Sequence, residues 1–122
     1  MKIVVPVDEN KLESSVCFSF GRAPYFLIYD TEAKTGRFLS NAAAASQGGA
    51  GIKAAQAVVD SGATALLTPR CGENAAAVLK AADVKLYQTA AGSAMENVTA
   101  FLAGKLPPLG EIHAGFHGRG GR

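Results

Sequence analysis

The segment that decides the fold is ALLTPRCGENAAAVLKAA, residues 65–82. It opens with an apolar run over residues 65–67 that Pro69 ends, the pattern of a strand buried on both faces. A helix is expected over residues 73–82, because apolar side chains recur there at the i, i+3, i+4, i+7 spacing: Ala75, Val78, Leu79 and Ala82. A strand that runs through a glycine turn, here Gly72, into a helix is the repeating unit of α/β proteins.

Two more glycine turns run into helical patterns, at residues 46–51 and 91–96. The first opens a helix expected over residues 51–61, whose core face would carry Ile52, Ala55 and Val59. The second carries Ser93 and Glu96 in an S-x-x-E capping box. Its helix is expected to end at Gly104 and to bury Met95, Val98 and Leu102.

The remaining strands are expected at residues 3–7, 25–29, 37–39 and 84–87. With the helices they give the order β-β-β-α-β-α-β-α in a single α/β domain. A meander followed by right-handed crossovers predicts a mixed five-stranded sheet ordered 3-2-1-4-5, with the second strand antiparallel and three helices.

In this order the first and fourth strands are neighbours, and the connections that leave them diverge. Ligands of open α/β sheets bind at such switch points, beyond the carboxyl ends of the strands. The long loop at residues 8–23 and the turn at residues 68–72 are expected to meet there. Three helix N-termini, with unpaired N–H groups and positive dipole ends, are expected to converge at this edge, which predicts an anion site.

Composition excludes several classes of protein. The 122 residues suffice for one domain with a core, and 48% of them are hydrophobic. A net charge of +2 without a concentrated basic face argues against nucleic-acid binding. No apolar run approaches the roughly 20 residues of a membrane span, and the first apolar run is too short for a signal peptide. A reducing cytoplasm is therefore expected, with both cysteines as thiols, in a monomer or weak dimer.

Four stretches of the sequence carry a family resemblance. They are Phe20-Gly21-Arg22-Ala23-Pro24-Tyr25-Phe26, the turn Gly48–Gly51, Gly72 ahead of its helix, and Val84–Tyr87. From Met1 to about Leu106 the chain resembles the dinitrogenase iron–molybdenum cofactor biosynthesis family, small single-domain proteins of ribonuclease-H-like topology. That family includes carriers of nitrogenase cofactor precursors and the orange protein of sulfate reducers, which holds a molybdenum–copper sulfide cluster.

The resemblance implies a domain over residues 1–106 that reversibly binds an anionic, molybdenum-containing metal–sulfur cluster without turnover. The cluster would be a Mo–Fe–S cofactor precursor or a Mo–Cu sulfide, exchanged with a cluster-donor or cluster-acceptor protein. One position departs from the family, because Ser19 stands where many relatives carry a histidine. The Gly/His/Arg-rich stretch 107–122 is expected to be a flexible tail.

Seven residues are candidates for holding the anion. Arg22, Arg70 and Lys53 can supply positive charge, the arginines through planar donors suited to sulfide or oxo groups. Glycines can supply backbone donors at close approach: Gly48, Gly49, Gly51 and Gly72. Plainer interpretations stay open, because Arg22 could form an ion pair with a nearby carboxylate, Lys53 could be solvated, and glycines are ordinary in turns.

Four residues are candidate metal ligands. Cys71 follows a cation at a helix N-terminus, a setting expected to lower its pKa and present thiolate, unless the thiol merely fills the turn. Cys17 is a possible second thiolate, although two cysteines alone cannot ligate a [4Fe–4S] cluster. His113 and His117 are four residues apart, but the glycines around them disfavour a helix, and a disordered terminus is the alternative.

The sequence argues against an enzyme. Ribonuclease-H-type catalysis needs clustered carboxylates around two metal ions, and only Asp8 and Asp30 follow the relevant strands. Both histidines lie in the tail, so no Ser-His-Asp arrangement is expected. A carrier of an anionic cluster is the expected function. Two alternatives stay open: a regulatory or scaffold protein that binds a partner, and a binder of phosphorylated metabolites at the helix N-termini.

Overall fold

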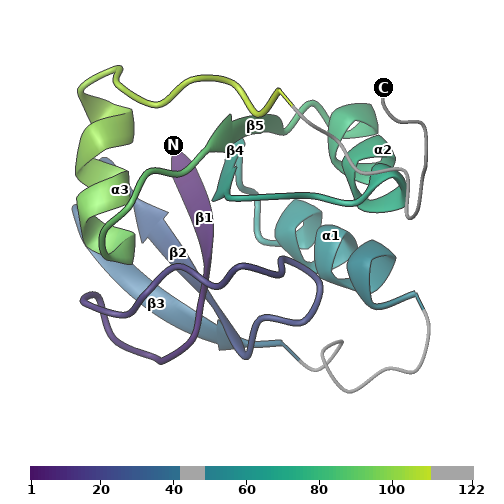
Figure 1. Ribbon diagram of the computed structural model, residues 1–122, viewed down its shortest axis with the longest axis horizontal. Coiled ribbons are helices and arrows are strands. Elements are labelled where there is room, and N and C mark those ends of the chain that lie inside the picture. The colour runs from purple at the N-terminus through teal and green to yellow at the C-terminus, as the bar shows by residue number, and fades with distance from the viewer. Residues whose placement is uncertain (42–48, 111–122) are drawn as a thin grey trace.

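The computed structural model of the chain describes residues 1–41 and 49–110, which form one mixed β-sheet with helices on both faces (Figure 1). The strands are β1 (Lys2–Val7), β2 (Tyr25–Asp30), β3 (Thr35–Ser40), β4 (Ala65–Thr68) and β5 (Lys85–Gln88). Their order is β3-β2-β1-β4-β5; β2 runs antiparallel to β1 and β3, and β4 runs parallel to β1 and β5. The predicted fold class, strand order and antiparallel second strand are confirmed.

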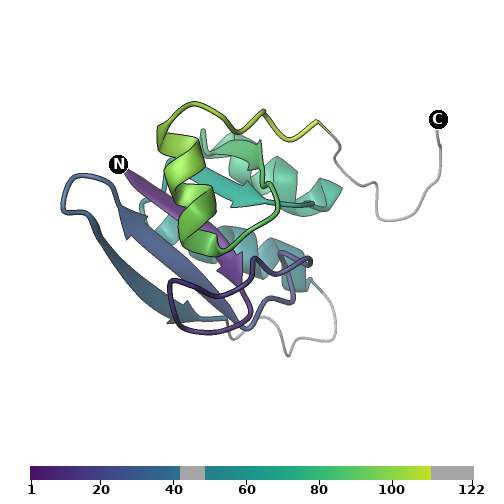
Figure 2. The same cartoon turned by 60° about the vertical axis from the view of Figure 1, so that its left-hand side comes forward.

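Three helices cover the sheet: α1 (Ala50–Asp60), α2 (Glu73–Ala81) and α3 (Ala94–Leu102). Helices α1 and α2 lie together on one face, and α3 lies on the opposite face (Figures 1 and 2). The predicted bounds of helices and strands differ from the observed ones by at most two residues. Within residues 1–41 and 49–110, no helix has the length and hydrophobicity needed to cross a membrane.

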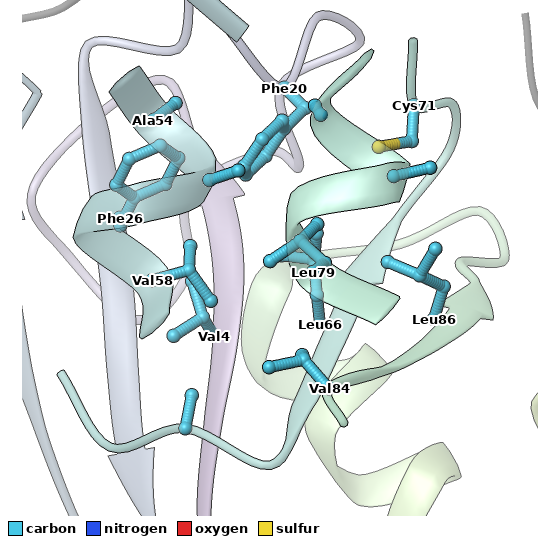
Figure 3. Packing of buried hydrophobic residues seen from close by; sticks show 14 of the residues in the cluster. Val4, Phe20, Phe26, Ala54, Val58, Leu66, Cys71, Leu79, Val84 and Leu86 are labelled. Atoms are coloured by element: carbon cyan, nitrogen blue, oxygen red, sulfur yellow. The ribbon is translucent and has the colours of Figure 1, made fainter. Parts of the chain in front are cut away.

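The two faces of the sheet build separate hydrophobic clusters, because alternate strand residues point to opposite sides. In β1, Val4 packs toward α1 and α2, whereas Ile3 and Val5 pack toward α3. Figure 3 shows the first cluster, in which sheet side chains meet the two helices: Val4, Phe26 and Leu66 from the sheet, Val58 from α1 and Leu79 from α2. Phe20 of the loop at residues 8–23 joins this cluster with its ring 5.4 Å from that of Phe26, which anchors the loop to the core.

Two large side chains of the predicted helix faces, Ile52 and Leu102, are exposed, as is the small Ala82 at the end of α2. Ile52 is 44% exposed, because α1 instead buries four small or medium side chains: Ala50, Ala54, Ala55 and Val58. Leu102 at the end of α3 is 53% exposed, and the polar Asn97 is buried instead. The Asn97 amide satisfies both backbone groups of Ala90, at 2.7 and 3.0 Å, so its burial leaves no polar atom without a partner.

The chain beyond α3 pairs with the free edge of β5. Gln88 N–H donates to the carbonyl of Pro107 at 2.8 Å, and Leu109 N–H donates to that of Leu86 at 3.0 Å. Within the described residues, the chain therefore stays hydrogen-bonded to the sheet as far as Leu109. Gly48, His113 and His117 lie outside the described residues.

Candidate anion-binding site

A cavity of about 410 Å³ lies beyond the carboxyl ends of β1 and β4, where the sequence predicts the ligand site. Three segments line it: residues 18–21 of the loop after β1, residues 49–52 at the start of α1, and residues 70–75 between β4 and α2. These segments are distant in sequence. The parallel pairing of β1 with β4 brings the first and third together, and α1 packs beside α2 to bring in the second.

Two uncapped helix N-termini open into this cavity. Gly49 and Gly72 occupy the N-cap positions of α1 and α2, and no side chain of the described residues caps either helix. The first N–H groups of a helix have no acceptor within it and carry the positive end of the dipole. Residues from the first turns of both helices therefore give the cavity a donor-rich, positive wall.

The third helix does not contribute, which corrects the prediction that three N-termini converge. Ser93 accepts from Glu96 N–H at 3.1 Å, and the Glu96 carboxylate accepts from Ser93 N–H at 2.7 Å, so the predicted capping box is present. Ala94 N–H donates to the Ser14 carbonyl at 2.8 Å, and Met95 N–H donates to the Leu12 carbonyl at 3.2 Å. The first turn of α3 is satisfied by the loop at residues 8–23 because α3 lies on the other face of the sheet.

Gly21 lets the loop approach α1 closely at Gly51. A Cβ atom on Gly21 would lie 3.0 Å from the Gly51 Cα atom, so any larger residue there would force the backbone of the loop and the helix apart by a few tenths of an ångström. The Asn41 amide donates to the carbonyls of Gly21 at 3.2 Å and Ala23 at 2.8 Å, which holds the loop in place. A Cβ atom on Gly51, which lines the cavity, would meet only the Ala75 Cβ atom at 3.6 Å, an ordinary contact, so the close approach depends on Gly21. Gly49 has φ 70, a left-handed conformation that favours glycine.

Arg70 supplies positive charge in the cavity lining. Its guanidinium carbon lies 4.8 Å from the centre of the Phe18 ring, a cation–π contact, and Phe18 is 63% exposed. The turn that carries Arg70 is held by Thr68, whose hydroxyl donates to the Arg70 carbonyl at 2.9 Å, and by Gln88, whose amide donates to the Pro69 carbonyl at 3.1 Å.

The thiols do not behave as the sequence predicts. Cys71 lines the cavity but is only 2% exposed, and this burial raises its pKa to about 11 despite the opposing charge of Lys80. The predicted lowering of this pKa is wrong, because desolvation of the buried thiol outweighs the lowering effect of the Lys80 charge. Cys17 lies outside the cavity lining, and burial, with a smaller contribution from Asp8, also raises its pKa.

The structure brings together five of the candidate residues at the cavity: Gly49, Gly51, Arg70, Cys71 and Gly72. Arg22 and Lys53 are exposed and do not line it. Sequence reasoning missed Phe18, Ile52 and Glu73, which do. Phe18 carried one usable signal, an aromatic residue in a polar loop beside the F-G-R motif. No group of three His, Cys, Asp or Glu side chains within residues 1–41 and 49–110 could hold a metal ion.

This geometry defines an α/β protein with a donor-rich cavity at the switch point of its sheet. The chain matches the family described as dinitrogenase iron-molybdenum cofactor over residues 1–104, and it belongs to that family. The structure resembles the apo form of the orange protein from Desulfovibrio gigas, with 33% identity, a TM-score of 0.85, and coverage of 89% of this chain and 92% of that one.

A NifB-like protein from Thermotoga is 35% identical, with a TM-score of 0.80 and 98% coverage of both chains. A dinitrogenase-like protein of Methanocaldococcus jannaschii shares the fold at 18% identity, with a TM-score of 0.69 over 91% of this chain and 96% of that one. No match was found among curated protein sequences.

Proposed function

We propose that this protein binds and carries an anionic metal–sulfur cluster that contains molybdenum, and releases it without chemical turnover. The observation that carries the proposal is the cavity itself, in which two uncapped helix N-termini and Arg70 meet in a member of the iron–molybdenum cofactor family. Both features favour a bound anion, through N–H donors and through charge.

The size of the cavity fits a polyatomic anion. Its volume of about 410 Å³ far exceeds the roughly 30 Å³ that one water molecule occupies in the liquid. A cluster with delocalised charge can share many weak donors at once, whereas a small ion could reach only a few of them. Glu73 also lines the cavity and opposes an anion, so Arg70 and the helix termini must outweigh one carboxylate.

The donor set favours a complete cluster over an ion that is ligated by the chain. Cys71, with its pKa raised to about 11, stays protonated at neutral pH, and the described residues offer no group of three metal-ligating side chains. The cargo would bring its own sulfide ligands and be held by hydrogen bonds and charge. Weak, shared contacts suit a carrier, because a cluster-donor or cluster-acceptor protein must be able to exchange the cargo. Carriage in a reducing cytoplasm, without catalysis, is part of this proposal.

The test is an anaerobic titration of the protein with tetrathiomolybdate, with and without Cu(I), followed by gel filtration and visible absorption. We expect a charge-transfer band that elutes with the protein. Arg70→Gln should weaken retention of the colour, whereas Arg37→Gln, on the edge strand β3 and outside the cavity lining, should not.

Three outcomes identify the kind of cargo, and a fourth refutes the proposal. Retention only with Cu(I) present favours a Mo–Cu sulfide, and retention only of an iron-containing precursor favours a Mo–Fe–S cluster. Absence of retained colour with every cluster tried would refute the proposal. Thermal protection by a phosphorylated metabolite but not by a thiomolybdate would identify the site as one for phosphate esters.

A further inference from the structure

Among the described residues, Phe18 belongs to neither hydrophobic cluster of the core. It is 63% exposed, and Phe20, two residues later, is the aromatic side chain that this loop contributes to the core. Phe18 nevertheless lines the cavity together with Ile52, which is also exposed. Two large apolar side chains are therefore exposed to water at a donor-rich site.

The position of Phe18 is explained by Arg70. The guanidinium carbon lies over the Phe18 ring at 4.8 Å from its centre. A cation–π contact of this kind is an attraction between the charge and the ring face, and it uses none of the guanidinium N–H donors. The ring comes from the loop after β1 and the guanidinium from the turn after β4, so the contact joins two walls of the cavity.

We propose that Phe18 and Arg70 act as one recognition element that selects weakly hydrated, sulfur-rich anions over strongly hydrated oxyanions of the same charge. Phe18 is the positioning residue, which holds the guanidinium at the cavity. This inference rests on the proposed function and adds to it the physical basis of selectivity.

The physical reason lies in hydration. A strongly hydrated anion loses water at the apolar side chains of Phe18 and Ile52 and at the protonated thiol of Cys71, and these groups return few hydrogen bonds. A thiometallate gives up weaker hydration and gains dispersion contacts with the same groups. The guanidinium is itself weakly hydrated, so its hydration strength is closer to that of a thiometallate than the hydration strength of an ammonium group is.

Tetrathiomolybdate and molybdate are suitable probes, because both are tetrahedral dianions of molybdenum that differ in sulfur and oxygen. Their affinities are compared by anaerobic equilibrium dialysis, with molybdate measured as a competitor. The variants are Phe18→Leu, Phe18→Tyr, Arg70→Gln and the double variant Phe18→Leu with Arg70→Gln. Leu102→Ala, an exposed side chain on α3, is the matched control.

We expect wild type to prefer tetrathiomolybdate. Phe18→Leu should weaken tetrathiomolybdate binding about two- to fivefold, the effect of one exposed cation–π contact, and narrow the preference over molybdate. Phe18→Tyr keeps an aromatic face, so its affinity for tetrathiomolybdate and its preference for that anion over molybdate should equal those of wild type. Phe18→Leu should have no further effect in the Arg70→Gln background, because the two residues act together.

The outcomes separate this inference from the proposed function. The Phe18–Arg70 element would be overturned if Phe18→Leu bound tetrathiomolybdate with the affinity and the preference over molybdate of wild type. Fully additive losses of affinity in the double variant would overturn it as well. Neither result would contradict the proposal that the protein carries a cluster. Failure of wild type to bind tetrathiomolybdate at all would overturn both the selectivity and the thiomolybdate form of the function. Since Phe18 is exposed, circular dichroism should show all its variants folded, and Leu102→Ala should bind as wild type.

Discussion

The protonation state of Cys71 leads to a direct test of how the cavity holds its ligand. With its pKa raised to about 11, only about one thiol in 10⁴ is ionised at pH 7. Metal coordination by sulfur requires the thiolate, so a bound metal would have to displace this proton at a cost of about 5 kcal/mol at pH 7. Hydrogen bonds from helix N-termini and Arg70 have no such cost.

The perturbation is therefore pH, applied to wild type and Cys71→Ala. If Cys71 ligates the cluster, the association constant for tetrathiomolybdate should rise about tenfold per pH unit between pH 7.5 and 9, because each binding event releases one proton. If the cluster is held as an intact anion, the constant should change less than about twofold over that range. We expect the second result, and the same affinity within about twofold in Cys71→Ala.

The assay is anaerobic equilibrium dialysis with the visible absorption of tetrathiomolybdate as readout. Cys17→Ala is the matched control, because Cys17 is the other free thiol and does not line the cavity. A tenfold rise per pH unit in wild type and in Cys17→Ala, absent in Cys71→Ala, would refute the reasoning and make Cys71 a metal ligand.

Three further predictions concern stability. Gly49→Ala should lower the free energy of unfolding about 1–2 kcal/mol more than Gly72→Ala does. Both residues are N-caps, but only Gly49 has a left-handed backbone, with φ 70 against −71 for Gly72. Equal urea midpoints for the two variants would contradict this prediction. Asn97→Ala should lower the free energy of unfolding, measured with urea, by about 2–4 kcal/mol, because it removes the hydrogen-bond partners of both backbone groups of Ala90. A decrease below about 1 kcal/mol would show that these backbone groups find other partners. The Cys71 pKa is higher in the folded chain than its ordinary value of 9.0, so its contribution to stability is complete below pH 9 and declines as pH rises to about 11. Between pH 9 and pH 11, the free energy of unfolding of wild type should thus fall by up to about 3 kcal/mol more than that of Cys71→Ala. Parallel pH profiles of the two proteins in urea titrations would rule out the raised pKa.

Local patterns in the sequence determined most of the fold. The continuous apolar run at Ile3–Val7 reflects burial on both faces of a strand, and the helical spacing after Gly72 reflects burial of one face of a helix. Both patterns can be read from neighbouring residues. The Ser93–Glu96 capping box was predicted for the same reason, since its hydrogen bonds join residues three apart. The order of elements then limited the sheet to a topology whose switch point is the cavity.

Only the tertiary structure decided what the cavity contains. Cys71 has the local surroundings of an acidic thiol, yet its pKa is raised because side chains distant in sequence exclude water from it. Arg22 belongs to the most recognisable motif but lies outside the lining, whereas Phe18 contacts a guanidinium more than fifty residues away in sequence. The sequence by itself determined which elements form and where they meet, because helix and strand periodicities are local. Burial, pKa and contacts across the cavity depend on long-range packing, and the folded structure alone decided them.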